Sequence, residues 1–246
     1  MSLFLIFPIL LGNFIINDFE VYNSKIFFTI NRGIFFAICD STNTMHILVN
    51  VGLGSTQVTS PTDLAIYGNL LYVVDKDVNQ VKIFDLYGNY FGKIDCPEPT
   101  AIATDRLGNL YILQSTFNKV IKIGIDSLTF GEFGRGEGFL NNPCDIAIDD
   151  DKIYIANTGN KRIDVFDLYG NFLHTIGEKL LSTPKSITFA GDNLVVCDTA
   201  IILFTKDGKF IKSISERVKK AVIRGNKLYL LRENGEFEVL ELQSAK

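Results

Sequence analysis

The sequence of 246 residues contains no Trp and only two Met, two His, four Cys and six Pro. The cysteines are spread singly, with no Cys-x-x-Cys pair and no compact His cluster, which argues against a zinc site. A Cys in a β-rich core usually acts as a small buried hydrophobic residue. The spacing leaves open the disulfide state of all four: Cys39, Cys96, Cys144 and Cys197.

The sequence also lacks low-complexity tracts and a strong charge of either sign. The formal net charge is −4, and the one compact run of like charge is Asp149 to Asp151, at an expected turn. A role in binding polyanions is therefore not indicated. The chain is 47% hydrophobic with 20 Phe and 9 Tyr, a composition that can bury a large core.

One hexapeptide occurs twice. Phe-Asp-Leu-Tyr-Gly-Asn spans Phe84 to Asn89 and again Phe166 to Asn171, 82 positions later, which is two periods of 41. Self-similarity at this period indicates stacked supersecondary units. Within each period, four β-rich runs follow one another, separated by turns. The fourth runs, for example, are expected at Tyr90 to Ile94, Phe130 to Phe133 and Phe172 to Ile176.

Four antiparallel strands per repeat are typical of a blade in a β-propeller. The sequence therefore predicts an all-β fold, a six-bladed β-propeller of four-stranded antiparallel blades in one domain over residues 1–246. The expected blades are 18–52, 61–95, 99–133, 143–177, 184–215, and 218–242 together with 3–7.

The N-terminal segment has two interpretations. Leu3 to Phe7 has the spacing of a missing fourth strand, which would close the ring by pairing with Phe237 to Leu242. Leu3 to Ile16 is also apolar enough for the core of a secretory signal, although no Lys or Arg precedes it and no small-x-small cleavage site follows. The first interpretation implies a cytoplasmic protein and the second an extracytoplasmic one. The segment is too short for a membrane span.

Residues 143–177 resemble an NHL repeat. They include Pro143-Cys-Asp-Ile-Ala-Ile and the loop Asn160-Lys-Arg-Ile, where that family usually has Asn-His-Arg-Ile. Asn157 stands where the family usually has Asp, and the second repeat keeps that residue as Asp75. The resemblance implies the propeller fold. It selects no function, because the family includes protein-binding and RNA-binding propellers, extracytoplasmic sensors and a peptidyl-amide lyase.

The predicted ring places the first residue of each inner strand at one mouth of the central channel. These residues are Asp18, Asp63, Ala101, Asp145, Ser186 and Lys220. The three carboxylates could hold calcium, because hard oxygen ligands suit that ion; the alternative is that each Asp caps a strand through nearby backbone N–H groups. Candidate ligand-binding residues at the mouth and the adjoining second-strand ends are Asp18, Asp63, Asp145, Asp75, Asn157, Asp198 and Lys220.

Basic residues are expected around the same rim: Arg32, Lys76, Lys119, Lys161, Arg162 and Arg232. They could form a surface for RNA or an acidic protein, although acidic residues share these loops. Phe133 to Gly138 is glycine-rich like a phosphate-binding loop, but no helical pattern follows it. It is therefore expected to be a flexible loop between blades.

No catalytic constellation stands out. There is no Gly-x-Ser-x-Gly motif, and His46 and His174 are both expected on outer strands, away from the channel where the lyase of the resembled family binds zinc. We therefore expect a monomeric, non-catalytic scaffold without a cofactor that binds a protein or peptide through the channel-mouth rim. The first alternative is a calcium-dependent hydrolase or lactonase, and the second is an RNA-binding propeller.

Overall fold

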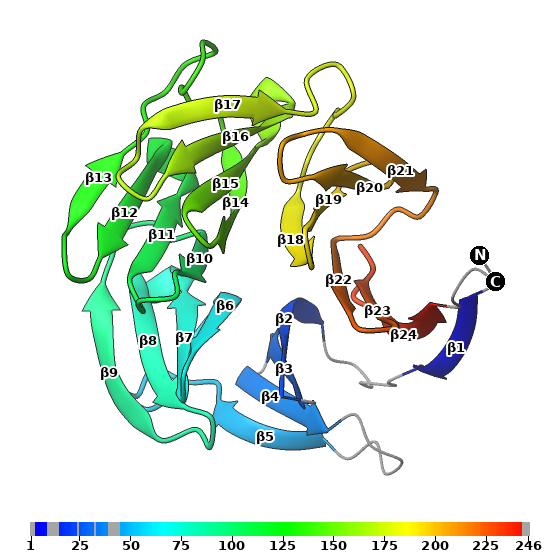
Figure 1. Ribbon diagram of the computed structural model, residues 1–246. Helices are drawn as coiled ribbons and strands as arrows, with labels where there is room; N and C mark the ends of the chain where they lie inside the picture. Colours follow the sequence, from blue (N-terminus) through cyan, green and yellow to red (C-terminus); the bar gives the residue numbers. More distant parts are fainter. Residues whose placement is uncertain (1–2, 9–14, 24, 32, 39–44, 243–246) are drawn as a thin grey trace.

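The computed structural model describes residues 3–8, 15–23, 25–31, 33–38 and 45–242. They form six four-stranded antiparallel sheets arranged as blades around a central channel (Figure 1). Blade 1 contains β2 (Ile16–Tyr22), β3 (Lys25–Ile30), β4 (Gly33–Ile38) and β5 (Met45–Asn50). Blade 2 contains β6 (Pro61–Tyr67), β7 (Leu70–Asp75), β8 (Gln80–Asp85) and β9 (Tyr90–Asp95). Blade 3 contains β10 (Ala101–Thr104), β11 (Leu110–Gln114), β12 (Lys119–Ile123) and β13 (Leu128–Phe130).

The remaining blades repeat this order. Blade 4 contains β14 (Pro143–Asp149), β15 (Lys152–Asn157), β16 (Arg162–Asp167) and β17 (Phe172–Ile176). Blade 5 contains β18 (Ser186–Ala190), β19 (Asn193–Cys197), β20 (Ile201–Thr205) and β21 (Phe210–Ile214). Blade 6 contains β22 (Lys220–Arg224), β23 (Lys227–Leu231), β24 (Phe237–Leu242) and β1 (Leu3–Pro8). Short 3-10 turns follow three second strands: η1 (Lys76–Val78), η2 (Ser115–Phe117) and η3 (Thr158–Asn160).

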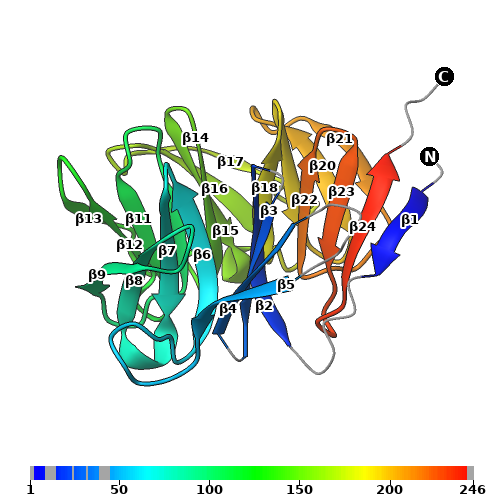
Figure 2. The same cartoon turned by 90° about the horizontal axis from the view of Figure 1, so that it is seen from below.

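The predicted all-β six-bladed propeller is confirmed. One boundary differs clearly: the fourth strand of blade 3 spans Leu128–Phe130 instead of Phe130 to Phe133. It ends at Phe130 because Gly131 adopts a φ of +92°, which turns the chain out of the strand. The six inner strands β2, β6, β10, β14, β18 and β22 face the channel (Figures 1 and 2).

The predicted closure of the ring is also confirmed. β1 pairs antiparallel with β24, with Leu3 opposite Leu242 and Leu5 opposite Leu240. Both ends of the described chain therefore contribute to blade 6 (Figure 2). This pairing covers the edge that β24 would otherwise expose.

The core is divided into clusters, one between each pair of neighbouring blades. Between blades 6 and 1, Phe237 packs edge-on against Phe19 and Phe28, with ring centroids 4.9 Å apart in both pairs. Burying side chains of this size stabilises the fold by about 1.5–3 kcal/mol each. Apolar packing thus holds the blades together, and each blade depends on both of its neighbours.

The repeated hexapeptide forms the turn between the third and fourth strands of blades 2 and 4. The Asp85 carboxylate accepts hydrogen bonds from the backbone N–H groups of Tyr87 and Asn89, both at 2.9 Å, and from the Asn89 side chain at 2.8 Å. Asp167 makes the same three bonds in blade 4. The hexapeptide is therefore a structural device, since it satisfies the polar groups of a tight turn.

Three cysteines lie in the described part of the chain, and Cys39 lies outside it. Cys96 and Cys197 are buried, Cys144 is half-buried, and all three are free thiols. Among the described residues, no helix has the length and apolar character needed to span a bilayer.

Candidate binding site at the channel mouth

The three carboxylates at the channel mouth each follow a β-bulge in the inner strand. In blades 1, 2 and 4 the register between the first and second strands shifts just before Asp18, Asp63 and Asp145. A bulge of this kind inserts an extra residue and re-aims the side chain that follows it. The first strands of blades 3, 5 and 6 show no such shift. Bulges therefore accompany the three inner strands whose third residue is an aspartate, and these strands start two residues before the aspartate at which the sequence predicted their start.

Each of these carboxylates ties its own blade to a neighbouring one. Asp63 accepts a hydrogen bond from the backbone N–H of Ile102 at 2.7 Å, and Asp145 accepts one from Ile187 at 2.8 Å. Both oxygens of Asp18 contact the Lys220 ammonium, at 2.8 and 3.0 Å. The strand-capping role that the sequence offered as an alternative to calcium binding therefore describes only part of what these carboxylates do. Asp145 does bond the nearby Ile146 N–H at 2.8 Å, but all three carboxylates also reach across a blade boundary.

The remaining blade boundaries carry their own inner contacts. The Asn17 amide donates to the Pro61 carbonyl at 2.8 Å, Ser115 donates to the Pro143 carbonyl, and Thr188 donates to the Ala221 carbonyl at 2.6 Å. Together with the three carboxylates, these contacts form a closed circuit of polar bonds around the channel. The circuit fixes the mouth against the spreading of any one blade.

Burial and mutual repulsion change the ionisation of this cluster. Burial raises the pKa of Asp63 well above its usual range, and the neighbouring Asp18 raises it further. Burial also raises the pKa of Asp145, to about 6, although Lys220 opposes the shift. For Lys220, burial acts to lower the pKa, but the surrounding carboxylates outweigh it and the pKa is raised. The lysine therefore remains a permanent cation facing three carboxyl groups.

This cluster divides the channel into two cavities. The mouth cavity, of about 380 Å³, opens on the face where the inner strands begin, which we call the upper face. The lower cavity, of about 230 Å³, is lined largely by the middle and later residues of the inner strands. The residues that line both cavities are Asp63, Asp145 and Lys220. They form the floor of the mouth cavity.

The donor set does not fit a calcium ion. Calcium requires six to eight oxygen ligands, whereas both oxygens of Asp18 face Lys220 and Asp145 is bonded to two backbone N–H groups. Within the ranges that the structure describes, no group of three or more His, Cys, Asp or Glu residues is arranged to hold a metal ion. Lys220 supplies the positive charge at the place where a metal would be needed.

From the sequence, Ser186 was expected at the channel mouth, whereas Thr62, which lines the same cavity above this floor, was not singled out. The hydroxyls of Thr62 and Ser186 are buried there and have no hydrogen-bond partner among the residues that the structure describes. Lys185 and Glu233 form an ion pair between the neighbouring blades 5 and 6, at one side of the mouth. Burial lowers the pKa of the neighbouring Lys219. The polarity of Ser186 at a strand start was visible in the sequence, but its missing partner depends on the packing of neighbouring blades.

The polar residues that end the six second strands have a common contact. Each side chain bonds or ion-pairs with the connection that precedes its own blade. Asp75, for example, accepts from the N–H groups of Thr59 and Ser60 at 3.0 and 2.7 Å. The six contacts are Asn31 with Ile15, Asp75 with Thr59, Gln114 with Pro97, Asn157 with Asn141, Asp198 with Ser182, and Arg232 with Glu216. Asp75, Asn157 and Asp198 are at most 1% exposed, so their position in the structure is that of loop anchors.

The basic rim is less basic than expected. Lys76, Lys119 and Lys161 are exposed, and Arg32 lies outside the described residues. Arg162, expected on the surface, is instead 6% exposed and is paired with Asp164 at 2.8 Å. Arg232 is paired with Glu238 at 2.9 Å and with Glu216 at 3.1 Å. Ion pairing thus removes two arginines from the cations that the rim offers to a partner.

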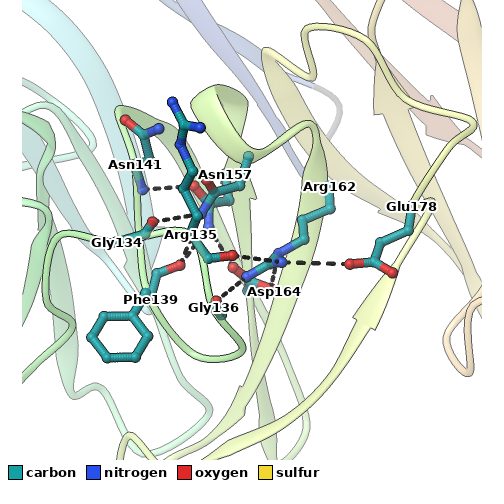
Figure 3. Close-up of polar contacts among 10 residues, drawn as sticks. Gly134, Arg135, Gly136, Phe139, Asn141, Asn157, Arg162, Asp164 and Glu178 are labelled. Carbon is teal, nitrogen blue, oxygen red and sulfur yellow. Dashed lines mark hydrogen bonds and ion pairs between the residues drawn. The ribbon is translucent and has the colours of Figure 1, made fainter.

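Arg162 belongs to a clamp that holds the loop between blades 3 and 4 (Figure 3). Its guanidinium donates to the carbonyls of Arg135 at 3.4 Å and Gly136 at 2.5 Å. The Asn160 amide donates to the carbonyls of Gly134 at 2.9 Å and Phe139 at 3.1 Å. Asn157 bonds the backbone of Phe139 and Asn141, and its amide also contacts Asp164. We call Asn157, Asn160, Arg162 and Asp164 the blade 4 clamp.

Comparison with known proteins supports the repeat assignment. The chain is 38% identical over 76 residues to mouse E3 ubiquitin-protein ligase TRIM71, which is 28% of this chain and 9% of that protein. It is 28% identical over 131 residues to human NHL repeat-containing protein 3, which is 50% of this chain and 34% of that protein. The matches thus span no more than about a third of these relatives' length. No family model matches the chain.

Solved structures share the fold at low identity. Virginiamycin B lyase from Staphylococcus aureus has a TM-score of 0.67 at 15% identity, covering 93% of this chain and 80% of that chain. A chain in a nidogen/laminin complex has a TM-score of 0.65 at 16% identity, covering 82% of this chain and 80% of that chain. Likeness at this identity concerns the fold alone. The six blades and the NHL-repeat relatives together support an NHL-type six-bladed β-propeller.

Proposed function

We propose that this propeller is a non-catalytic scaffold that binds a protein or peptide at the channel-mouth rim. The observation that carries the proposal is the mouth cavity, a socket of about 380 Å³ with a charged floor and two hydroxyls that have no partner within the described part of the chain. A buried polar group left unpaired costs about 1–3 kcal/mol. Polar atoms of a partner that entered the socket would meet the charged floor, and rotation of the Thr62 and Ser186 side chains toward the socket would let their hydroxyls pair with the partner.

The charges around the socket support a polar segment over an apolar ligand. Lys185, Lys219 and Lys220 face Asp18, Asp145 and Glu233, so both signs are present within one cavity. A peptide offers both hydrogen-bond donors and acceptors, and it can meet such a mixed lining. The nidogen/laminin complex supports the proposal from another side, because it contains a chain of this fold within a protein complex.

Lyase chemistry receives less support. A solved H270A form of the staphylococcal lyase is described as catalytically inactive. In this chain both histidines lie in outer strands, His46 in β5 and His174 in β17, away from the channel.

The test is a selection of peptides from a random library on the wild-type propeller, followed by binding measurements on charge-reversal variants. Lys185→Glu and Glu233→Lys should each weaken the selected peptides, because they reverse one side of the mouth. The double variant, which swaps the pair, should recover part of the affinity. Lys93→Glu on the outer strand β9 is the matched control. If the selected peptides bind both single variants as tightly as the wild type, the mouth is not the binding site. If the wild type turns over members of a lactone or peptide panel and both variants abolish this turnover, an enzyme is favoured.

A further inference from the structure

The loop between blades 3 and 4, residues 131–142, is the longest connection between described blades. It crosses the upper face and carries Gly134, Gly136 and Gly138. Although it is exposed, it is tied down at both ends. Phe133 and Leu140 form an isolated β-bridge within the loop, and the Asn142 N–H donates a hydrogen bond to the Asn118 side chain at 2.8 Å.

The blade 4 clamp fixes the orientation of three successive peptide groups in this loop. The carbonyls of Gly134, Arg135 and Gly136 all accept hydrogen bonds from Asn160 or Arg162, so they point toward blade 4 (Figure 3). The chain contains no cis peptide bond among its described residues. In a trans peptide the C=O and N–H groups point in opposite directions. The N–H groups of Arg135, Gly136 and Glu137 therefore point away from the clamp.

These three N–H groups donate to no other group within the described part of the chain. Arg135, Gly136 and Glu137 are all exposed residues. Neither the Arg135 guanidinium nor the Phe139 ring is directed at the Arg162 guanidinium (Figure 3). Successive backbone N–H groups that face the same side bind anions, because their partial positive charges add.

We infer that residues 134–138, which we call the donor loop, bind one oxyanion carried by a partner peptide, a carboxylate or a phosphate. This inference rests on the proposed function, in which the upper face meets a peptide, and it names the chemistry of one contact. The Arg135 guanidinium adds a charged donor that matches an oxyanion. Phe133 and Phe139, which are 67% and 39% exposed, flank the donor loop and provide apolar contact for neighbouring residues of the peptide.

Two carboxylates limit what this site accepts. Glu132 and Glu137 are both exposed beside the three donors. They oppose the approach of a chain with many negative charges, because each further phosphate would meet them. The donor loop therefore suits a single acidic side chain among apolar neighbours, and it does not suit RNA.

The experiment is an amide chemical-shift titration of the full, isotope-labelled chain. The probes are acetyl-Gly-Phe-Asp-Leu-Gly-amide, its Asn counterpart, its phosphoserine counterpart, and a single-stranded RNA of ten nucleotides. We expect the Asp and phosphoserine peptides to shift the amides of Arg135, Gly136 and Glu137 in a saturable way. The Asn peptide should bind at least about tenfold more weakly, since a charge-assisted bond is lost. Shifts that the Asn peptide reproduces, no shifts at all, or stronger shifts with RNA would overturn the inference.

Variants separate the donor loop from the mouth. Arg135→Gln should weaken the Asp peptide about tenfold, whereas Arg217→Gln, at another exposed arginine between blades, should leave it unchanged. Asn160→Ala should also weaken binding, because it releases the Gly134 carbonyl without changing any charge. Lys185→Glu should leave these shifts intact. If the Asp peptide shifts the donor-loop amides but no selected peptide is weakened by the mouth variants, the proposed function alone is refuted. If the mouth variants weaken the selected peptides but the donor-loop amides do not shift, this inference alone is refuted.

Discussion

Blades 2 and 4 share the hexapeptide turn, yet they hold their preceding loops with charges in different places. In blade 2, the Asp75 carboxylate binds the loop N–H groups and pairs with Lys82 at 2.9 Å. The positions 82 residues later are Asn157 and Asp164, so a neutral amide replaces the carboxylate and a carboxylate replaces the lysine. The cation of blade 4 is Arg162, which stands where blade 2 has Gln80.

Both arrangements contain one buried carboxylate and one buried cation. Lys82 and Arg162 are 4% and 6% exposed, and Asp75 and Asp164 are 0% exposed. The repeat therefore preserves local neutrality and the bonding of the loop, while the identities of the residues change. Replacing the lysine of blade 2 by the arginine of blade 4 changes how many loop carbonyls the cation binds. Lys82 reaches one carbonyl, that of Gln57, whereas the planar fork of Arg162 reaches two successive carbonyls.

The largest effect is expected from removing the blade 4 cation. Arg162→Ala leaves Asp164 buried without a positive partner, so the free energy of unfolding should fall by about 3–5 kcal/mol. Urea denaturation measures the change, with Lys161→Ala as the neighbouring exposed control, for which about 0.5 kcal/mol or less is expected. A loss of under about 1 kcal/mol for Arg162→Ala would mean that the buried pair does not hold the blade.

Introducing the blade 2 charges at the equivalent positions of blade 4 tests the comparison further. Asn157→Asp brings a second carboxylate beside Asp164, and Asp164→Lys places a second cation beside Arg162; each single change should destabilise the protein. The double variant, which rebuilds the blade 2 pair within blade 4, should be more stable than the sum of the two singles predicts. We expect a coupling of about 1–3 kcal/mol in a double-mutant cycle. Additive losses would show that the two positions do not communicate.

The mouth differs from both clamps, because one buried lysine faces three carboxyl groups. Because the pKa values of Asp63 and Asp145 are raised, the folded state binds more protons than the unfolded state above about pH 4, and for Asp145, whose pKa is about 6, this excess fades above that pH. Protonation of these groups should therefore increase the free energy of unfolding as pH falls from 7 to 5, by up to about 1.4 kcal/mol per pH unit for each group.

Asp145→Asn should remove its share of this gain. The difference between wild type and variant cancels the opposite contribution of His174, whose pKa burial lowers. Asp167→Asn is the control. Partial burial opposes ionisation of Asp167, but hydrogen bonds from Asn171 outweigh it and lower the pKa, so its effect belongs below about pH 4. Identical pH profiles for wild type and Asp145→Asn would contradict the raised pKa.

The fold was predictable because period, turn chemistry and strand pattern all repeat along the chain. The position of Asp18, Asp63 and Asp145 at the mouth followed from the same register. Their partners did not, because the N–H groups of Ile102 and Ile187 belong to neighbouring blades, and the distance between blades is set by packing and not by the spacing of residues along the chain. Arg162 looked like a surface cation because its partner, Asp164, is two residues away, on the same face of a strand whose burial depends on the loop packed over it.

The clamp and the mouth both lie on the upper face of the propeller. The most direct measurement is an amide-shift map of the whole chain with a library-selected peptide. The proposed function predicts shifts at Thr62, Ser186 and Lys220 around the mouth, with Tyr87 and Tyr169 in the turns of the opposite face unchanged. Shifts confined to the lower cavity, at Thr104 and Arg224, or to the outer strands would contradict it.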